Sequence, residues 1–152
     1  MKNLFYTLIT LTAFAVIGCG EPSISEQFAK QEAEFSEVMK GHDEVMPKTG
    51  ELSKLSREMK NYVVNTPDMN DSLKARVNQT IVKMLDAEEA MFAWMADIKQ
   101  LPELRKDKNH SQILDYLEDQ EEIMEKVKKM TDESLSQGKE VWAGLATPVD
   151  TE

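Results

Sequence analysis

Residues 38–62, VMKGHDEVMPKTGELSKLSREMKNY, decide the fold of this chain. Every seventh residue of this stretch is apolar: Val38, Val45, Leu52 and Met59. This spacing is typical of the side of a helix that packs against other helices. Pro47 lies inside the stretch and would normally end or kink a helix, but the apolar spacing continues through it unchanged. The pattern therefore predicts one long helix, about residues 23–65, kinked at Pro47, with two separate helices as the alternative.

Two further stretches carry apolar residues at the three- and four-residue spacing of a helix. The first, about residues 72–100, has these positions: Val77, Ile81, Met84, Met91, Met95 and Ile98. The second, about residues 111–142, has these: Ile113, Leu117, Met124, Val127 and Met130. We expect Pro102 to stop the middle helix. We also expect residues 105–110 to form a polar loop in which His110 is exposed to solvent.

Long helices with short polar connections usually pack as antiparallel bundles. No run of alternating β-branched residues predicts a strand. We therefore expect an all-α protein with one domain over residues 23–146. Its architecture would be an antiparallel up-down bundle of three long helices, with a four-helix bundle as the alternative. A flexible tail, residues 147–152, is expected after the domain.

Residues 1–20, MKNLFYTLITLTAFAVIGCG, have the organisation of a bacterial export signal. A basic second residue precedes an apolar run that is long enough for a signal peptide and short for a membrane span. Val16-Ile17-Gly18-Cys19 resembles the lipobox of bacterial lipoproteins. The resemblance implies that residues 1–18 are a cleaved lipoprotein signal peptide, that Cys19 is lipidated, and that residues 19–22 are a short tether. The lipid would anchor the protein to the inner or outer membrane of the cell envelope, facing the periplasm or the cell surface.

The mature chain would be strongly acidic. Removal of 18 of the 152 residues leaves 134, with 17 basic and 28 acidic side chains and a net charge of −11. Such a surface repels nucleic acid and anionic lipid headgroups, so neither is an expected ligand. Cys19 is the only cysteine. No disulfide can therefore form within the chain, and packing alone must stabilise the fold.

The familiar catalytic patterns are missing from the sequence. It contains no glycine-rich phosphate loop, no Gly-x-Ser-x-Gly nucleophile elbow, no His-Glu-x-x-His zinc helix and no Glu-x-x-His pair of a di-iron bundle. We therefore expect a protein that is not an enzyme. It would be a lipid-anchored helical interaction or structural module whose partners are the membrane, through the lipid on Cys19, and another envelope protein.

One group of side chains could carry more specific chemistry. Six residues on the facing sides of the first two predicted helices would form one layer: Met39, His42, Met46, Glu88, Met91 and Met95. In the plainest hypothesis this layer is a methionine-rich core, in which His42 is buried neutral or paired with Glu88.

Two hypotheses give the same layer a ligand. Thioethers and imidazole suit Cu(I), so the layer could bind copper or another soft metal. The ligands would then come from this set: His42, Met39, Met46, Met91 and Met95. A more remote alternative is haem b, held between His42 and a methionine of a facing helix.

Two strings in the chain resemble a known group of proteins. Residues 42–48, HDEVMPK, and residues 87–95, AEEAMFAWM, are similar to small uncharacterised lipoproteins from Bacteroidota, some of which carry the label "viral A-type inclusion protein". The resemblance covers roughly residues 30–100 and the lipobox. It implies a lipid-anchored helical protein and assigns no activity to it.

Overall fold

A computed structural model describes residues 22–146, and these residues form helices without any strand. The helices are α1 (Ile24–Asn65), α2 (Asp71–Asp97), α3 (Leu101–Asp107) and α4 (His110–Ala146). The all-α prediction is confirmed for the described residues. They form the three long helices that were predicted and the short α3, four helices in all, as in the alternative. The predicted signal peptide, the predicted lipidated Cys19 and the predicted tail (147–152) lie outside the described residues.

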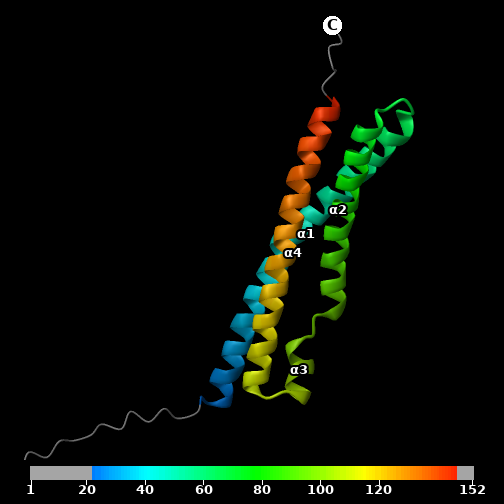
Figure 1. Cartoon of the computed structure of the whole chain (residues 1–152). Coiled ribbons are helices and arrows are strands. Elements are labelled where there is room, and N and C mark those ends of the chain that lie inside the picture. The colour runs from blue at the N-terminus through cyan, green and yellow to red at the C-terminus, as the bar shows by residue number, and fades with distance from the viewer. Residues whose placement is uncertain (1–21, 147–152) are drawn as a thin grey trace, which may run out of the picture.

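The three long helices lie side by side and form a rod, with the short α3 at one end (Figure 1). That end also holds the starts of α1 and α4, and we call it the base. The opposite end, the tip, holds the turn between α1 and α2 and the end of α4 (Figure 1). α1 and α4 therefore run in the same direction and α2 runs against both. α1 packs most extensively against α4.

Local sequence features explain where α1 starts and where it ends. Ser23 caps it in a capping box: its side chain accepts from Glu26 N, and Ser23 N donates to the Glu26 carboxylate at 2.8 Å. The helix continues through Pro47, although proline has no N–H to donate to the carbonyl of Asp43. Nearby, Thr49 Oγ1 donates to the carbonyl oxygen of Met46 at 2.6 Å. It ends at Asn65, just before Thr66 and Pro67, because a residue that precedes proline disfavours helical geometry.

Asn70 is the N-cap of α2. Its side-chain oxygen accepts from the backbone N–H groups of Ser72 and Leu73. At the start of α4, Asn109 and Gln112 form a reciprocal cap: each side-chain oxygen accepts from the other residue's backbone N–H at 3.0 Å.

The middle helix ends before Pro102, at Asp97, but the proline is not its stop: Pro102 lies in the first turn of α3. Proline fits there, since the N–H groups of the first turn have no partner within the helix. The helix is held by Leu101 and Leu104, which are 3% and 2% exposed and pack against Ile113 and Leu117 of α4. Part of the predicted polar loop, residues 105–110, is therefore helical.

The core runs the length of the rod as three clusters. The tip cluster is built around Leu52, Met59, Val77 and Met84. The middle cluster is built around Val38, Val45, Met91, Trp94, Met124 and Val127. The base cluster is built around Leu101, Leu104, Ile113 and Leu117. All four seam residues of the 38–62 stretch are at most 2% exposed, as the seven-residue spacing predicts. Met130 was predicted to be buried with the last helix but is 40% exposed.

No helix in the described part of the chain is long and apolar enough to cross a membrane.

Candidate functional site

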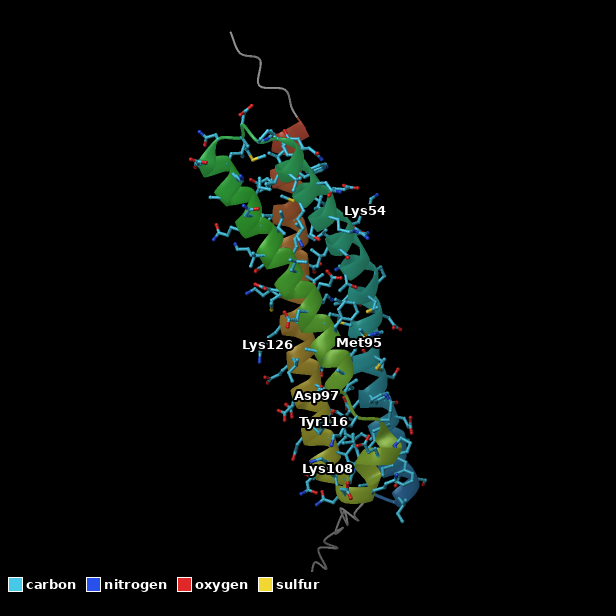
Figure 2. All side chains as sticks on the ribbon, turned by 90° about the vertical axis from the view of Figure 1, so that its right-hand side faces the viewer. Lys54, Met95, Asp97, Lys108, Tyr116 and Lys126 are labelled. Carbon is cyan, nitrogen blue, oxygen red and sulfur yellow. The ribbon has the colours of Figure 1, made fainter. Side chains whose placement is uncertain are left out.

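His42 lies at the middle cluster, between α1 and α2. Its side chain is 18% exposed. Its Nδ1 is 2.9 Å from Asp43 Oδ1, and its Nε2 is 3.4 Å from the sulfur of Met95 on α2. Figure 2 shows Met95 on the base half of α2, beside α1. The imidazole is therefore held by a carboxylate on the solvent side and by a thioether on the core side.

The contact with Asp43 determines the tautomer of the neutral ring. A carboxylate accepts hydrogen bonds and cannot donate them, so Nδ1 of His42 carries the proton that is shared with Asp43. In the neutral imidazole, Nε2 then bears a lone pair. The Met95 sulfur is also an acceptor without a hydrogen. In this form two lone-pair atoms face each other at 3.4 Å, whereas in the doubly protonated ring Nε2 donates to the sulfur.

Trp94 packs against His42 on the core side. Its indole is 4% exposed, and its ring centroid is 5.8 Å from that of His42, with the ring planes tilted by 34°. Its Nε1 is buried without a hydrogen-bond partner in the described structure. A buried N–H without a partner is costly, so this indole is held in place by packing.

The structure brings the predicted methionines to one cluster. Met39, Met46 and Met95 are half-buried and pack against the middle cluster, whereas Met91 belongs to the cluster and is fully buried. Met39 and Met46 lie about one turn before and one turn after His42 on the same face of α1. No group of three His, Cys, Asp or Glu side chains within residues 22–146 is placed to hold a metal ion.

The predicted pair of His42 with Glu88 is not present in the structure. Both ring nitrogens of His42 have other partners, Asp43 and Met95. Glu88 precedes Met95 by seven residues on α2, which is about 10 Å along a helix. Since α2 runs against α1, Glu88 lies level with residues further along α1 toward the tip.

A second polar cluster at the base was missed by the sequence analysis. Gln31 is 2% exposed, and its Oε1 accepts from Arg105 Nε at 2.8 Å, while its Nε2 donates to His110 Nδ1 at 3.0 Å. Arg105 also pairs with Glu32 at 3.0 Å and lies 4.2 Å above the ring of Phe28. The prediction that His110 is exposed in a loop is therefore wrong: it is the first residue of α4 and is half-buried.

The sequence contained one signal for this cluster. Gln31 precedes Val38 by seven residues and so continues the apolar seam with a polar side chain. A polar residue at a seam position predicts a buried partner. Nothing in the sequence identified Arg105 and His110 as the partners, because both are more than 70 residues away.

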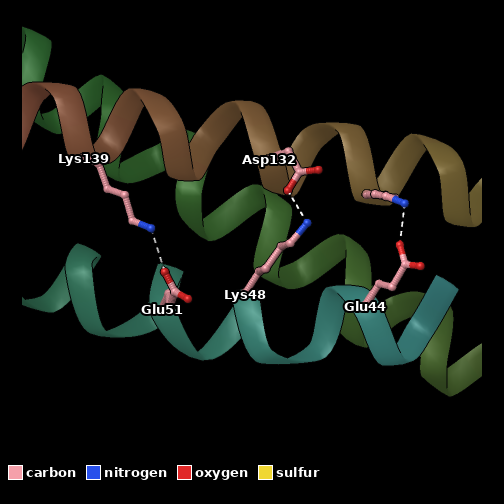
Figure 3. Close-up of polar contacts among 6 residues, drawn as sticks. Glu44, Lys48, Glu51, Asp132 and Lys139 are labelled. Carbon is pink, nitrogen blue, oxygen red and sulfur yellow. Dashed lines mark hydrogen bonds and ion pairs between the residues drawn. The ribbon is translucent and has the colours of Figure 1, made fainter. Parts of the chain in front are cut away.

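α1 and α4 are linked on the surface by three ion pairs, which we call the ladder (Figure 3). From base to tip the pairs are Glu44 with Lys128, Lys48 with Asp132 at 2.6 Å, and Glu51 with Lys139 at 2.8 Å. The sign alternates along α1: acid, base, acid. An exposed ion pair contributes only about 0–1 kcal/mol, but this alternation disfavours a one-turn slip of the two helices.

Two pKa values reflect the first pair. The hydrogen bond and charge of Lys128 hold the pKa of Glu44 below its ordinary value of 4.5. Reciprocally, Glu44 holds the pKa of Lys128 above its ordinary value of 10.5. Both groups are therefore charged over a wider pH range than in the unfolded chain.

Comparison with protein-family models, with curated proteins and with solved structures found no match to this chain. The function must therefore be inferred from the residues of this chain and their contacts.

Proposed function

We propose that the protein is a lipid-anchored protein of the cell envelope that acts as a non-enzymatic interaction or structural module. The observation that carries this proposal is the position of the cap at Ser23. A rigid helix begins only a few residues after the predicted lipidation site at Cys19. At about 3.3–3.6 Å per extended residue, the base of the rod would lie within about 15 Å of the membrane.

The dimensions of the rod support a role in presenting a surface. α1 has 42 residues and is therefore about 63 Å long at 1.5 Å per residue. With its base near the lipid, the tip would extend away from the bilayer. The rod would expose its sides to other envelope proteins.

The exposed sides carry apolar residues that could contact a partner. Val82 and Phe92 on α2 are 54% and 49% exposed, and Ile123 and Met130 on α4 are each 40% exposed. They are surrounded by charged side chains, and the mature chain carries a net charge of −11 if residues 1–18 are removed. A partner with a basic surface and small apolar contacts would complement such positions.

The contacts of His42 also fit a role without catalysis. Its neighbours are a carboxylate, a thioether and an indole ring. None of these is a nucleophile that a histidine base would activate.

Anchoring is tested by growing cells with labelled palmitate. We expect the label on the wild-type chain and none on Cys19→Ser, which should leave the membrane fraction. A wild-type chain without label would overturn the anchoring part of the proposal.

The interaction role is tested separately with a photo-crosslinking amino acid at Val82 or Phe92, in intact cells. We expect a discrete product heavier than the monomer. The matched control is the same amino acid at Gln79, an exposed position on α2. A monomer as the only product at Val82 and Phe92 would overturn the interaction role and leave the anchoring result unaffected.

A further inference from the structure

When the His42 ring is neutral and its Nδ1 donates to Asp43, Nε2 has no hydrogen to share with Met95 Sδ, which lies 3.4 Å away. Asp43 accepts a hydrogen bond from Nδ1–H of this neutral ring, so Nε2 presents a lone pair to a sulfur that also has only lone pairs. A cation between them would convert this unfavourable approach into two bonds. The chemistry of the pair, one imidazole nitrogen and one thioether, is that of ligands for a soft monovalent ion.

We propose that His42 and Met95, with a thioether from Met39 or Met46, form a binding site for Cu(I). The ion binds as Cu(I) and leaves in the same oxidation state, so no electron is transferred. Met91 is fully buried in the middle cluster and is not part of the site.

The observed separation suits a shared ion. Typical metal bonds are about 2.0 Å to an imidazole nitrogen and about 2.3 Å to sulfur. With these lengths, a nitrogen and a sulfur 3.4 Å apart give an N–Cu–S angle of roughly 100–105°. This angle is close to tetrahedral and leaves room for a third ligand. The two ligand atoms already lie within the distance that one ion can bridge.

The third ligand comes from α1 itself. Met39 and Met46 flank His42 by one turn on the same face, and both side chains are half-buried. A methionine side chain has three rotatable bonds and adapts easily to a new position. A sulfur from either side can therefore reach an ion that is already held by His42 and Met95.

Two neighbours support the site without bonding to the ion. Asp43 accepts from Nδ1 of His42, which is the arrangement that fixes the tautomer and orientation of metal-binding histidines and makes the other nitrogen more basic. Trp94 places an aromatic ring beside the imidazole, 5.8 Å from centroid to centroid. An indole face attracts a cation, especially where water is excluded.

The experiment is a Cu(I) titration of the full-length chain carrying Cys19→Ser, in detergent, under anaerobic reducing conditions. The substitution removes the thiol that would otherwise compete for copper. A colorimetric Cu(I) chelator serves as competitor. We expect one Cu(I) per chain with a submicromolar Kd. Free Cu(I) at about a hundred times the Kd should raise the melting temperature by roughly 8 °C.

Variants identify the ligands. His42→Ala and Met95→Leu should each weaken binding at least tenfold, and the Met39→Leu/Met46→Leu double variant should do the same. The matched control is Met130→Leu, because Met130 is an exposed methionine on α4 and should bind Cu(I) like the parent chain. Asp43→Asn should weaken binding less than His42→Ala does.

Circular dichroism and the melting temperature of each metal-free variant separate a lost ligand from a lost fold. For any variant that unfolds, X-ray absorption at the copper edge of the parent chain replaces it, with one nitrogen and at least two sulfur neighbours expected. A parent chain that binds Cu(I) no tighter than micromolar would overturn the proposal. Equal affinities of the parent and a folded His42→Ala variant, or a copper spectrum without sulfur neighbours, would also overturn it.

Discussion

Gly41 of α1 lies directly against Met124 of α4: a Cβ atom at position 41 would be 2.6 Å from Met124 Cγ. Met124 is 3% exposed, so its side chain has little room to retreat. The close approach of α1 and α4 at this level therefore requires a residue without a side chain.

This contact predicts opposite effects for two similar substitutions. Gly50 also lies inside α1, but a Cβ added there meets nothing within 4 Å. Gly50→Ala should therefore raise the free energy of unfolding by about 0.5–1 kcal/mol. Gly41→Ala should lower it by about 1–3 kcal/mol, because overpacking outweighs the gain in helix propensity. Urea denaturation of both variants measures the difference. Equal effects at the two positions would contradict the close approach.

Pro47 should cost the protein stability. It cannot donate the backbone hydrogen bond that the carbonyl of Asp43 would receive within a regular helix, and its side chain is exposed and packs little. Pro47→Ala should raise the free energy of unfolding by up to about 3 kcal/mol. Pro67, in the turn between α1 and α2, is the control. Pro67→Ala should lower it by roughly 0.4–1 kcal/mol, because proline restricts the unfolded chain. A stability loss in Pro47→Ala would mean that the proline is needed for the path of the helix.

Substitutions of Met91 measure whether this methionine stabilises the fold by its volume alone, as a core residue does. It is fully buried in the middle cluster. Met91→Ala should lower the free energy of unfolding by about 2–5 kcal/mol, whereas Met91→Leu should cost less than about 1.5 kcal/mol, since it keeps most of the volume. Met130→Ala, at an exposed methionine, should change it by no more than about 0.5 kcal/mol. Thermal or urea melts give all three values, and a large loss in Met91→Leu would show that the sulfur itself matters.

The ladder predicts a pH dependence with two limbs. The pKa of Glu44 is lower in the folded protein than in the unfolded chain, so its stabilisation is complete above about pH 4.5 and is lost as the pH falls through the lower, folded value. The pKa of Lys128 is raised, so its stabilisation is complete below about pH 10.5 and is lost as the pH rises through the folded value. The pair therefore stabilises the fold between these limits.

Glu44→Gln removes this pair, so the difference in urea midpoint between wild type and variant should be largest near neutral pH and vanish in acid. Glu37→Gln is the control, because Glu37 pairs with Lys40 within α1 and does not link two helices. A difference that is the same at pH 3 and pH 7 would exclude an electrostatic role for Glu44.

Removing the buried amide of Gln31 at the base should destabilise the fold more than removing the exposed charge of Glu32. Gln31→Ala leaves Arg105 Nε and His110 Nδ1 without their partner, and should lower the free energy of unfolding by about 1–3 kcal/mol. Glu32→Gln removes only the exposed ion pair with Arg105 and should cost at most about 1 kcal/mol. Urea melts of the two variants, compared with wild type, test this ranking. Similar small losses would mean that water replaces the amide.

The sequence was sufficient for the elements whose burial is periodic. Val45 and Leu52 are completely buried because a seven-residue spacing allows only one side of α1 to face the core. The same reasoning failed at Met130, because α4 packs against only two long helices. Its buried stripe is narrow, and a position at its edge is exposed.

Proline was ambiguous in a way that local sequence cannot resolve. Pro47 was correctly interpreted as interior to a helix only because the apolar spacing crosses it. Pro102 has no such context: a proline both ends helices and begins them. The contacts of Leu101 and Leu104 with α4 decide the outcome, and they are tertiary.

The candidate site was predictable in composition and not in contacts. Helical spacing placed His42 with the methionines, and the structure gathers them at one cluster. The pairing of His42 with Asp43 rather than Glu88 depends on the axial offset between α1 and α2. The spacing of apolar residues within each helix does not predict that offset.

The parallel pairing of α1 with α4 has a consequence for biosynthesis. Among the described helices, α1 is synthesised first and its main packing partner, α4, is synthesised last. Until α4 has been synthesised, the seam of α1 lacks its main cover and the core cannot close. The rod can therefore close only after almost the whole chain has been made.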